Sequence, residues 1–438
     1  MPTGGRSLAV IGAGWAGLAT AVQAVQAGHA VTVFEMALHG GGRARTVSHH
    51  DLVLDNGQHI LIGAYRETLA LLRTVGVDPN ASLRRQPLTL VDPSGRGLRL
   101  DVGAATPAFA KAVLRASHWP WRARLALLWT AARWRLAGFR AAPSQSVADL
   151  TRELPAPVRH DLIEPLCVAA LNTPAADASA EVFLRVMRDA LFGGPGAADL
   201  LLPRVPLGDL LPSPAIDWLH RHGASVRFGH RVTTLVPASP RGWIVDGLAF
   251  DAVVLACSAS QAARLAGAID VAWAACTAGL DYQPIVTVYL TSKGSRLANP
   301  MTSVSCSVIH PAQFVFDLGA IDGGGPRSGL FAFVTSGARD WLERGIDAIV
   351  EATLLQARDA FPAGTWRVAP TLVQAIAERR ATFACRPALT RPRAGIAPGL
   401  AAAGDFVQGP YPATLEGAVM SARQALAMLD LEAGPHLS

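Results

Sequence analysis

The stretch Leu8-Ala-Val-Ile-Gly-Ala-Gly-Trp-Ala-Gly-Leu18, with Val31-Thr-Val-Phe-Glu35 after it, decides the fold of this chain. An apolar strand leads into a Gly-x-Gly-x-x-Gly turn, a helix, a second strand and an acidic residue. This is the spacing of a dinucleotide-binding βαβ unit. Gly12 permits the sharp turn, Gly14 lets backbone N–H groups approach a pyrophosphate, and Gly17 lets the helix pack closely on the strand. The stretch therefore predicts dinucleotide binding.

The helix after this turn supplies partial positive charge for phosphate binding. Its first residues, Trp15 and Ala16, stand where free N–H groups and the helix dipole favour an anion. Glu35 lies 18 residues past Gly17, where a carboxylate can accept both hydroxyls of an adenosine ribose. The apolar run Leu8–Val25 has some likeness to a signal peptide, but its glycines match the nucleotide fingerprint, so we interpret it as a strand and a helix.

The composition indicates a large, basic and apolar protein. A length of 438 residues favours two intertwined domains, and the mean hydropathy of +0.28 favours a large core or a surface that meets lipid or an apolar substrate. The net charge is +6, yet no basic run is interleaved with aromatic residues, so nucleic-acid binding is not expected. A basic surface facing anionic lipid fits better. Five scattered cysteines without metal-ligand spacing predict a reduced, cytoplasmic protein with no metal site.

A glycine-rich turn, Gly40-Gly-Gly-Arg-Ala-Arg45, makes the dinucleotide prediction more specific. A guanidinium fork suits a diphosphate, and Gly57 in the following Asp55-Asn-Gly-Gln-His59 segment permits close backbone approach. The motif Gly-Gly-Arg-x-x-Thr at Gly41–Thr46 resembles the flavoprotein superfamily of amine oxidases, carotenoid desaturases and protoporphyrinogen oxidase. The resemblance implies that the dinucleotide is FAD.

The resemblance also implies which residues contact FAD. In that superfamily the arginine meets the pyrophosphate, the Asp-x-Gly segment lies by the flavin ring, and a later valine gives backbone contacts to the adenine. A Gly-Asp pair near the C-terminus contacts the ribityl chain, and the last helix points its N-terminus at the pyrimidine edge. The matching positions are Gly42, Arg43, Gly57, Gln58, Val232, Gly404, Asp405, Thr414 and Leu415. No cysteine lies near Gly404–Tyr411, so the flavin is expected to be non-covalent.

The implied fold class is α/β. A Rossmann-like FAD-binding domain of the glutathione-reductase-2 type would be interleaved with a substrate domain made of a mixed sheet and helices. We assign residues 1–80, 203–270 and 385–438 to the FAD-binding domain, and residues 81–202 and 271–384 to the substrate domain. Within these, Arg231–Val236 predicts a strand that carries Val232, and Arg339–Phe361 predicts one helix.

The segment Trp119–Arg140 predicts an amphipathic helix that can lie in a membrane interface. Arginines interrupt it every few residues, so it is not a transmembrane helix. At 100° per residue one apolar stripe, edged by arginines on both sides, comprises Trp121, Leu125, Leu128, Trp129, Ala132, Leu136 and Phe139. The alternative is an ordinary helix over a core or a dimer contact, which Leu127 and Trp134 on the opposite side favour.

Three local strings, at Leu54–Thr68, Pro165–Thr173 and Gly404–Ala418, resemble one branch of the superfamily. They are similar to the squalene-associated FAD-dependent desaturases, which are bacterial hydroxysqualene dehydroxylases. The resemblance implies reduction of hydroxysqualene, a C30 allylic alcohol, to squalene, a hopanoid precursor. Two alternatives stay open. One is a carotenoid or phytoene-type desaturase, because the sequence does not fix the direction of hydride transfer. The other is a prenyl-binding escort protein that uses no flavin.

The implied chemistry needs a group that protonates or polarises the leaving hydroxyl. His59 is the first candidate, because it is expected near the flavin and imidazole titrates near neutrality, and Tyr411 is the second. Alternatively, His59 only hydrogen-bonds the backbone or the flavin. No second glycine-rich turn follows a strand and opens a helix, so the external electron donor is unidentified.

Overall fold

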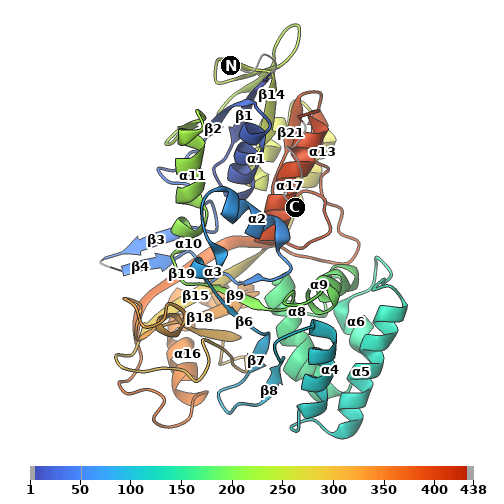
Figure 1. The fold of residues 1–438 in the computed structure, drawn as a ribbon, viewed down its shortest axis with the longest axis vertical. Coiled ribbons are helices and arrows are strands. Elements are labelled where there is room, and N and C mark those ends of the chain that lie inside the picture. The colour runs from blue at the N-terminus through green and yellow to red at the C-terminus, as the bar shows by residue number, and fades with distance from the viewer. Residues whose placement is uncertain (1–4, 51, 432–438) are drawn as a thin grey trace.

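A six-stranded sheet forms the upper part of the protein, in a computed structural model that describes residues 5–50 and 52–431 (Figure 1). All neighbouring strands pair in parallel except the last two. The order is β10 (Ser225–Arg227), β2 (Ala30–Phe34), β1 (Ser7–Ile11), β14 (Ala252–Leu255), β21 (Leu400–Ala402) and β20 (Gly395–Ala397). The central strands β1 and β14 are apolar on both faces because both faces are covered.

Helices cover one face of this sheet and a small antiparallel sheet covers the other. The covering helices are α1 (Trp15–Gln26), α11 (Pro212–Arg221) and α17 (Leu415–Met428), flanked by α2 (Arg66–Thr74) and α10 (Leu207–Leu210). The small sheet consists of β11 (Leu235–Pro237), β12 (Trp243–Val245) and β13 (Leu248–Phe250). Two helices after β14, α12 (Ala259–Ala266) and α13 (Val271–Ala278), pack on each other.

A five-stranded antiparallel sheet lies in the lower part (Figure 1). Its order is β16 (Met301–Ser303), β17 (Phe314–Asp317), β18 (Leu330–Ser336), β15 (Tyr282–Thr291) and β19 (Thr371–Phe383). Side chains alternate between two hydrophobic cores along β15. Val286 and Val288 belong to the core that includes α16 (Ile346–Asp359), the helix after α15 (Arg339–Arg344). Ile285 and Tyr289 belong to the core on the other face of the sheet.

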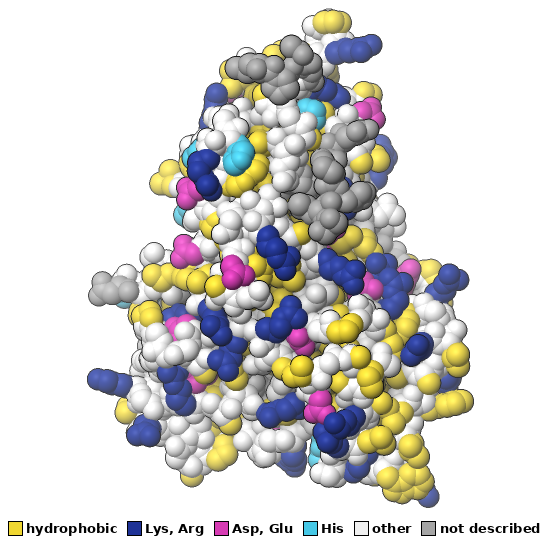
Figure 2. Space-filling view, in the orientation of Figure 1, with side chains coloured by type: hydrophobic (Ala, Val, Ile, Leu, Met, Phe, Trp, Pro, Cys, Tyr) yellow, Lys and Arg dark blue, Asp and Glu magenta, His cyan; other side chains and the backbone are white. Residues whose placement is uncertain are grey.

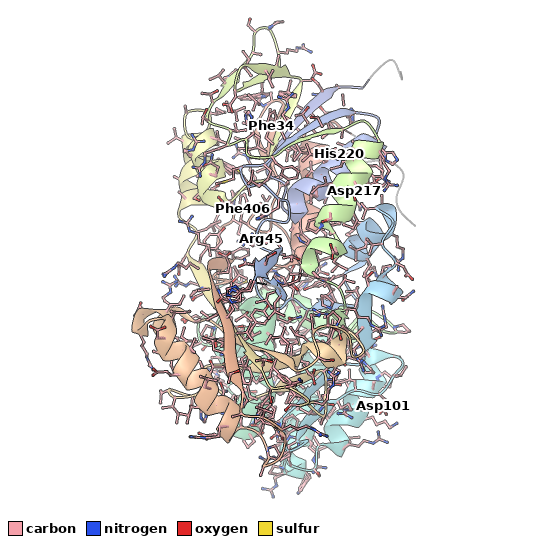
Figure 3. All side chains as sticks on the ribbon, turned by 90° about the vertical axis from the view of Figure 1, so that its left-hand side faces the viewer. Phe34, Arg45, Asp101, Asp217, His220 and Phe406 are labelled. Atoms are coloured by element: carbon pink, nitrogen blue, oxygen red, sulfur yellow. The ribbon has the colours of Figure 1, made fainter. Side chains whose placement is uncertain are left out.

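Helices and short strands complete the lower part. The helices are α3 (Pro79–Ser82), α4 (Ala105–Arg115), α5 (Trp121–Leu136), α6 (Val147–Thr151), α7 (Ala156–Val158), the π-helix η1 (Arg159–Ile163), α8 (Glu164–Leu171), α9 (Ala180–Phe192) and α14 (Leu318–Ile321). The strands are β3 (Thr46–His49), β4 (Leu52–Asp55), β5 (Leu61–Ile62), β6 (Leu83–Gln86), β7 (Thr89–Val91), β8 (Gly97–Arg99) and β9 (Leu200–Pro203). In the side view, Phe34 lies in the upper part and Asp101 in the lower part (Figure 3).

Helix α5 is shorter than expected, but its apolar stripe faces outward. The helix begins after Pro120 and ends at Leu136, because Gly138 and Phe139 take positive φ values. Trp121, Leu125, Trp129, Ala132 and Leu136 are exposed, whereas Leu128 is partly buried against the core and Phe139 packs against Phe192. Figure 2 shows hydrophobic side chains gathered at the lower right, over α4 and α5. Among the described residues, no helix is long and apolar enough to cross a membrane.

Two other sequence predictions were wrong in detail. The expected strand at Arg231–Val236 begins only at Leu235, because the side chain of Asp246 takes the N–H groups of Thr233 and Thr234. The expected helix at Arg339–Phe361 is two helices, because Gly345 takes φ +101° and separates α15 from α16.

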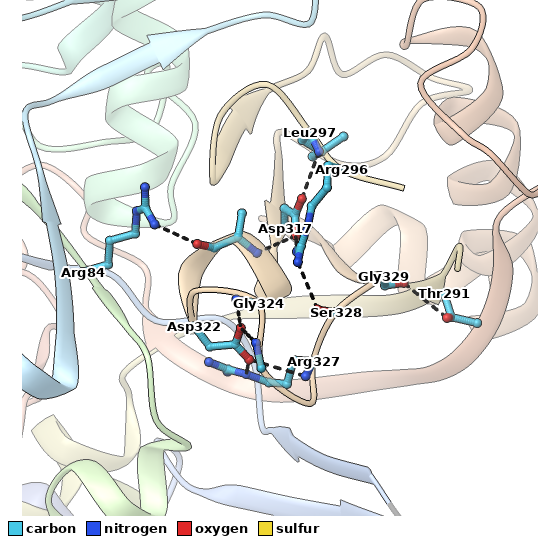
Figure 4. A network of polar contacts seen from close by, with 12 residues as sticks. Arg84, Thr291, Arg296, Leu297, Asp317, Asp322, Gly324, Arg327, Ser328 and Gly329 are labelled. Carbon is cyan, nitrogen blue, oxygen red and sulfur yellow. Dashed lines mark hydrogen bonds and ion pairs between the residues drawn. The ribbon is translucent and has the colours of Figure 1, made fainter. Parts of the chain in front are cut away.

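A network of polar contacts links the five-stranded sheet to the strands beside it (Figure 4). Asp317 is fully buried, pairs with Arg296 and accepts the N–H of Ala320 at the start of α14. Arg327 pairs with Asp322 and donates to the backbone oxygen of Arg204, just after β9. These contacts hold the lower sheet against the strands that lead to the upper part.

Candidate active site

One cavity of about 850 Å³ runs from the carboxyl ends of the upper strands into the lower part. Its upper walls carry nearly every residue that the sequence predicted for the site. Those that line it are Gly12, Gly14, Trp15, Ala16, Glu35, Gly42, Arg43, Gly57, Gln58, His59, Val232, Gly404, Asp405, Tyr411, Thr414 and Leu415. Phe34 and Phe406 also line it, and Figure 3 shows Phe406 below Phe34 on the way to the lower part.

The first glycine turn leaves the N-terminus of α1 open to the cavity. Gly12 has φ +113°, and a Cβ there would lie 2.6 Å from the backbone oxygen of Ala256. Gly17 does not line the cavity; a Cβ on it would lie 1.9 Å from the oxygen of Gly12, so its role is close packing. Gly14 is the N-cap and offers no side chain to the first N–H groups of α1. An anion at this helix end would fill that gap.

Glu35 is buried, and its carboxylate accepts hydrogen bonds from the backbone of the glycine-rich turn. Its Oε2 accepts the N–H of Ala13 at 2.7 Å, and its Oε1 accepts the N–H of Ala37 at 2.8 Å. Each carboxylate oxygen therefore retains a lone pair, which is what two neighbouring hydroxyls of a ribose require.

The Val232 segment is held by side chains instead of by a strand ladder. The oxygen of Val232 accepts from Arg264 at 2.8 Å and from Gln261 at 3.2 Å. The N–H of Val232 has no partner among the described residues, so it remains for a ligand. Although burial alone would raise it, hydrogen bonds from Thr234, His230 and other groups hold the pKa of Asp246 well below its usual range. Asp246 is thus an ionised anchor for this segment.

Arg43 joins the two ends of the chain. Its guanidinium pairs with Asp405 at 2.5 Å and donates to the oxygen of Ala381 on β19 at 2.7 Å. The amide of Asn56 donates to the oxygen of Arg43 and to Glu378. Arg43 and Gly42, which takes φ +60°, both line the cavity. The contact of Arg43 with the pyrophosphate that the resemblance implied stays a prediction beside this ion pair.

His59 lies on the cavity wall as a neutral hydrogen-bonding group. Its Nδ1 lies 3.0 Å from the oxygen of Gly57. A carbonyl oxygen only accepts, so Nδ1 carries the proton and Nε2 is an acceptor. Burial lowers the pKa of His59, and the charge of Arg43 lowers it further. The imidazole is therefore poorly suited to donate a proton.

Tyr411 belongs to a charge cluster that the sequence did not reveal. Its hydroxyl donates to Asp189 on α9 at 2.7 Å, and Asp189 also pairs with Arg185 and Arg188. Burial raises the pKa of Tyr411, and the hydrogen bond to Asp189 raises it further. The pairing spans 222 residues, so no local pattern could have indicated it.

The C-terminal segment closes the cavity as expected, with added supports. Gly404 donates its N–H to Ser421 at 2.7 Å, and Thr414 caps α17 by accepting the N–H of Gly417. Arg391, which the sequence did not single out, donates to the backbone oxygens of Asp405, Gly409 and Tyr411. One partly buried side chain therefore shapes the loop that carries two of the candidate residues.

Two further polar residues missed by sequence reasoning line the cavity, Tyr282 on β15 and Glu378 on β19. Burial raises the pKa of Tyr282 to about 12, and the charge of Asp405 contributes. Among the described residues its hydroxyl has no hydrogen-bond partner. Both residues lie on long strands of otherwise ordinary composition, so only the sheet pairing brings them to the site.

The lower end of the cavity is apolar. Its walls come from β7, α4, α8, α9 and β17, and include Leu90, Phe109, Leu166, Met187, Phe314 and Phe316. Within the described ranges, no group of His, Cys, Asp and Glu could hold a metal ion.

A comparison with protein families matches residues 15–426 to the flavin-containing amine oxidoreductases. The chain belongs to this family. It is an oxidoreductase with FAD as cofactor, and the open helix ends, the Glu35 carboxylate and the glycine-lined turn fit that group. Family membership decides against the escort-protein alternative.

Among curated relatives, two hydroxysqualene dehydroxylases match over nearly the whole chain. The protein of Rhodopseudomonas palustris is 30% identical over 98% of this chain and 99% of its own. That of Sinorhizobium fredii is 26% identical over 96% and 97%. A zeta-carotene desaturase of Synechocystis is 35% identical over only 23% of this chain and 21% of its own.

Solved structures confirm the α/β fold. An oxidoreductase from Methanosarcina mazei has a TM-score of 0.73 at 17% identity, covering 96% of this chain and all of that one. At this identity the likeness concerns the fold alone.

Proposed function

We propose that this protein reduces hydroxysqualene to squalene with FAD. The observation that carries the proposal is a continuous cavity with dinucleotide-binding turns at its upper end and apolar walls at its lower end. A C30 hydrocarbon needs a long apolar chamber, and a hydride transfer needs that chamber to open beside the flavin. The curated relatives, similar over their full length, supply the substrate class.

The reaction breaks an allylic C–O bond and forms a C–H bond. Bound and reduced FAD supplies the hydride, and one proton converts the leaving hydroxyl to water. The chain itself binds and orients the hydrocarbon between apolar walls such as Phe109 and Phe316. It also excludes water, because a water molecule that reached the allylic cation would return it to the alcohol.

We propose Tyr282 as the proton donor to the leaving hydroxyl. His59 uses its Nδ1 proton on Gly57, and Tyr411 uses its proton on Asp189. Tyr282 lines the same cavity and carries its proton at neutral pH, because its pKa, which burial raises to about 12, lies far above 7. Replacement Tyr282→Phe should lower kcat by ten- to a hundredfold with KM little changed. His59→Ala with turnover as low as that of Tyr282→Phe would restore His59 as the acid.

The proposal includes peripheral contact with the cytoplasmic face of the cell membrane. Hydroxysqualene dissolves in lipid, so the enzyme must collect it there. The five cysteines among the described residues are all unpaired, in keeping with a reducing compartment.

The test is product analysis after anaerobic incubation of the FAD-loaded protein with hydroxysqualene and dithionite. Squalene formed in step with flavin oxidation supports the proposal, and a reaction without dithionite is the control. A second incubation pairs oxidised protein with squalene or phytoene. Desaturated product there, with no squalene in the first incubation, would favour the carotenoid-desaturase alternative, which the partial match to zeta-carotene desaturase supports.

A further inference from the structure

The outer surface of α5 carries large apolar side chains that no described residue covers. Trp121, Leu125, Trp129 and Leu136, here called the α5 face, follow one another at helical spacing. Trp121 is 64% exposed and Trp129 is 66% exposed. Leu114 at the end of the neighbouring α4 is also exposed. Such a cluster on one side of two packed helices exceeds the scattered apolar residues of an ordinary surface.

The opposite side of α5 packs against the hydrophobic core. Ala123 and Leu127 are buried, and Trp134 meets Phe183 edge to face with ring centroids 6.4 Å apart. The helix is therefore apolar on two sides while the protein needs only one of them. The α5 face is left for something outside the described fold.

The positive charge of the protein is concentrated around this face. Residues 101–140 contain seven lysines and arginines and a single carboxylate, Asp101. Their net charge of +6 equals that of the whole chain, so the remainder is balanced. The guanidinium of Arg122 lies over the ring of Trp121 at 5.6 Å, beside the apolar surface. Figure 2 shows Lys and Arg side chains among the hydrophobic ones in this region.

We propose that the α5 face docks on an anionic phospholipid bilayer. Tryptophan and leucine on one face, edged by arginine, is the pattern of an interfacial helix, with the guanidinium groups at the headgroups. Anionic headgroups match the excess of positive charge in residues 101–140. A second copy of this chain would bring two such surfaces together, and their like charges would repel.

Helix α4 connects the docking surface with the cavity. Its Leu114 points out beside α5, whereas its Phe109 lines the apolar end of the cavity. Helix α4 therefore contributes both to the proposed lipid-facing surface and to the wall of the chamber for the hydrocarbon. The inference rests on the proposed function in one respect: the lipid-soluble substrate would reach the chamber across α4.

The experiment is flotation of the FAD-loaded full chain with vesicles of phosphatidylcholine alone and with 30% phosphatidylglycerol. The variant Trp121→Ser/Trp129→Ser removes the aromatic anchors. The matched control is Val308→Ser/Ile309→Ser, an equally exposed apolar pair outside the basic segment. We expect the wild type and the control to float with anionic vesicles, and the tryptophan variant to bind at least tenfold more weakly.

A second variant lowers the positive charge of the surface and keeps all its apolar side chains. Arg122→Gln/Arg140→Gln removes two exposed cations that form no ion pair among the described residues. At roughly 1 kcal/mol for each arginine near an anionic surface, binding should fall about 20- to 30-fold. It should fall further as salt rises.

The outcomes separate the docking surface from the chemistry. The inference would be overturned if the wild-type protein did not float with anionic vesicles, or if the variants floated as well as the wild type. A dimer that the tryptophan variant converts to monomers while flotation is unchanged would also overturn it. If vesicle binding behaves as expected but no squalene forms from detergent-dispersed hydroxysqualene, the proposed function fails and the docking surface stands. Conversely, the tryptophan variant should keep its detergent activity and lose activity on vesicle-embedded substrate.

Discussion

Replacing Glu35 with Gln tests how one carboxylate serves both the fold and the cofactor. Its two oxygens accept the N–H groups of Ala13 and Ala37 at 2.7 and 2.8 Å, and the side chain is 8% exposed. Gln offers one acceptor oxygen and one amide, so one of these N–H groups would face another donor. Losing a hydrogen bond to a charged acceptor costs about 1.5–3 kcal/mol.

The same loss should appear separately in FAD affinity. The lone pairs left on Glu35 are the ones we assign to the ribose hydroxyls, and Gln can serve only one of them. A further loss of about 1.5–3 kcal/mol corresponds to a roughly 10- to 150-fold higher Kd for FAD. Flavin fluorescence quenching on titration of apoprotein measures the affinity, and thermal unfolding of apoprotein measures the structural part as a Tm lower by about 1–4 °C.

The matched control is Glu67→Gln. Glu67 pairs with Arg423 at 2.7 Å on a partly exposed surface, where an ion pair contributes about 0–1 kcal/mol. FAD affinity should be unchanged in this control. A Glu35→Gln protein that binds FAD as tightly as Glu67→Gln would refute the assignment of Glu35 to the ribose, even if its Tm were lower.

The remaining predictions concern stability and the cavity walls. Burial raises the pKa of Asp55 to about 6, so the native state holds an extra proton between pH 3.8 and 6, and stability falls as pH rises through that window. Relative to wild type, Asp55→Asn should gain about 2–3 kcal/mol between pH 4 and 7, measured by denaturant unfolding at each pH. Gly17→Ala would place a Cβ 1.9 Å from the oxygen of Gly12, so little folded, yellow protein should be recovered; a normal yield with bound flavin would contradict the packing role. Phe109→Trp narrows the apolar chamber and should raise KM for hydroxysqualene severalfold with an unchanged flavin spectrum; equal KM values would remove Phe109 from the binding surface.

The sequence was most informative where short motifs carry backbone geometry. The turn at Gly12–Gly17 and the acid at Glu35 each depend on residues close in the chain, so their spacing alone predicted the upper unit. The outward stripe of α5 followed from helical periodicity in the same way. The roles of the individual residues toward FAD and the division of the chain into domains stay predictions.

The sequence could not predict contacts between segments that lie far apart in the chain. Asp189 meets Tyr411 across 222 residues, and Tyr282 reaches the cavity only because β15 pairs with β18 and β19 in the lower sheet. Irregular backbone was missed for a related reason. The Val232 segment has the composition of a strand, but a side chain, Asp246, satisfies its N–H groups, and that competition leaves no periodic signal.

The pairing of Arg43 with Asp405 means that the site forms only when segments from both ends of the chain have folded together. The two residues are 362 positions apart, and they meet at 2.5 Å with Asp405 almost fully buried. Burying Asp405 without this partner would carry a large desolvation cost, so the N-terminal turn and the C-terminal loop stabilise each other. Arg391 adds to this by fixing the oxygens of the same loop. The dinucleotide-binding site is therefore complete only when the last strand and helix have joined the first, and FAD binding should report the folding of the entire protein, not of the βαβ unit alone.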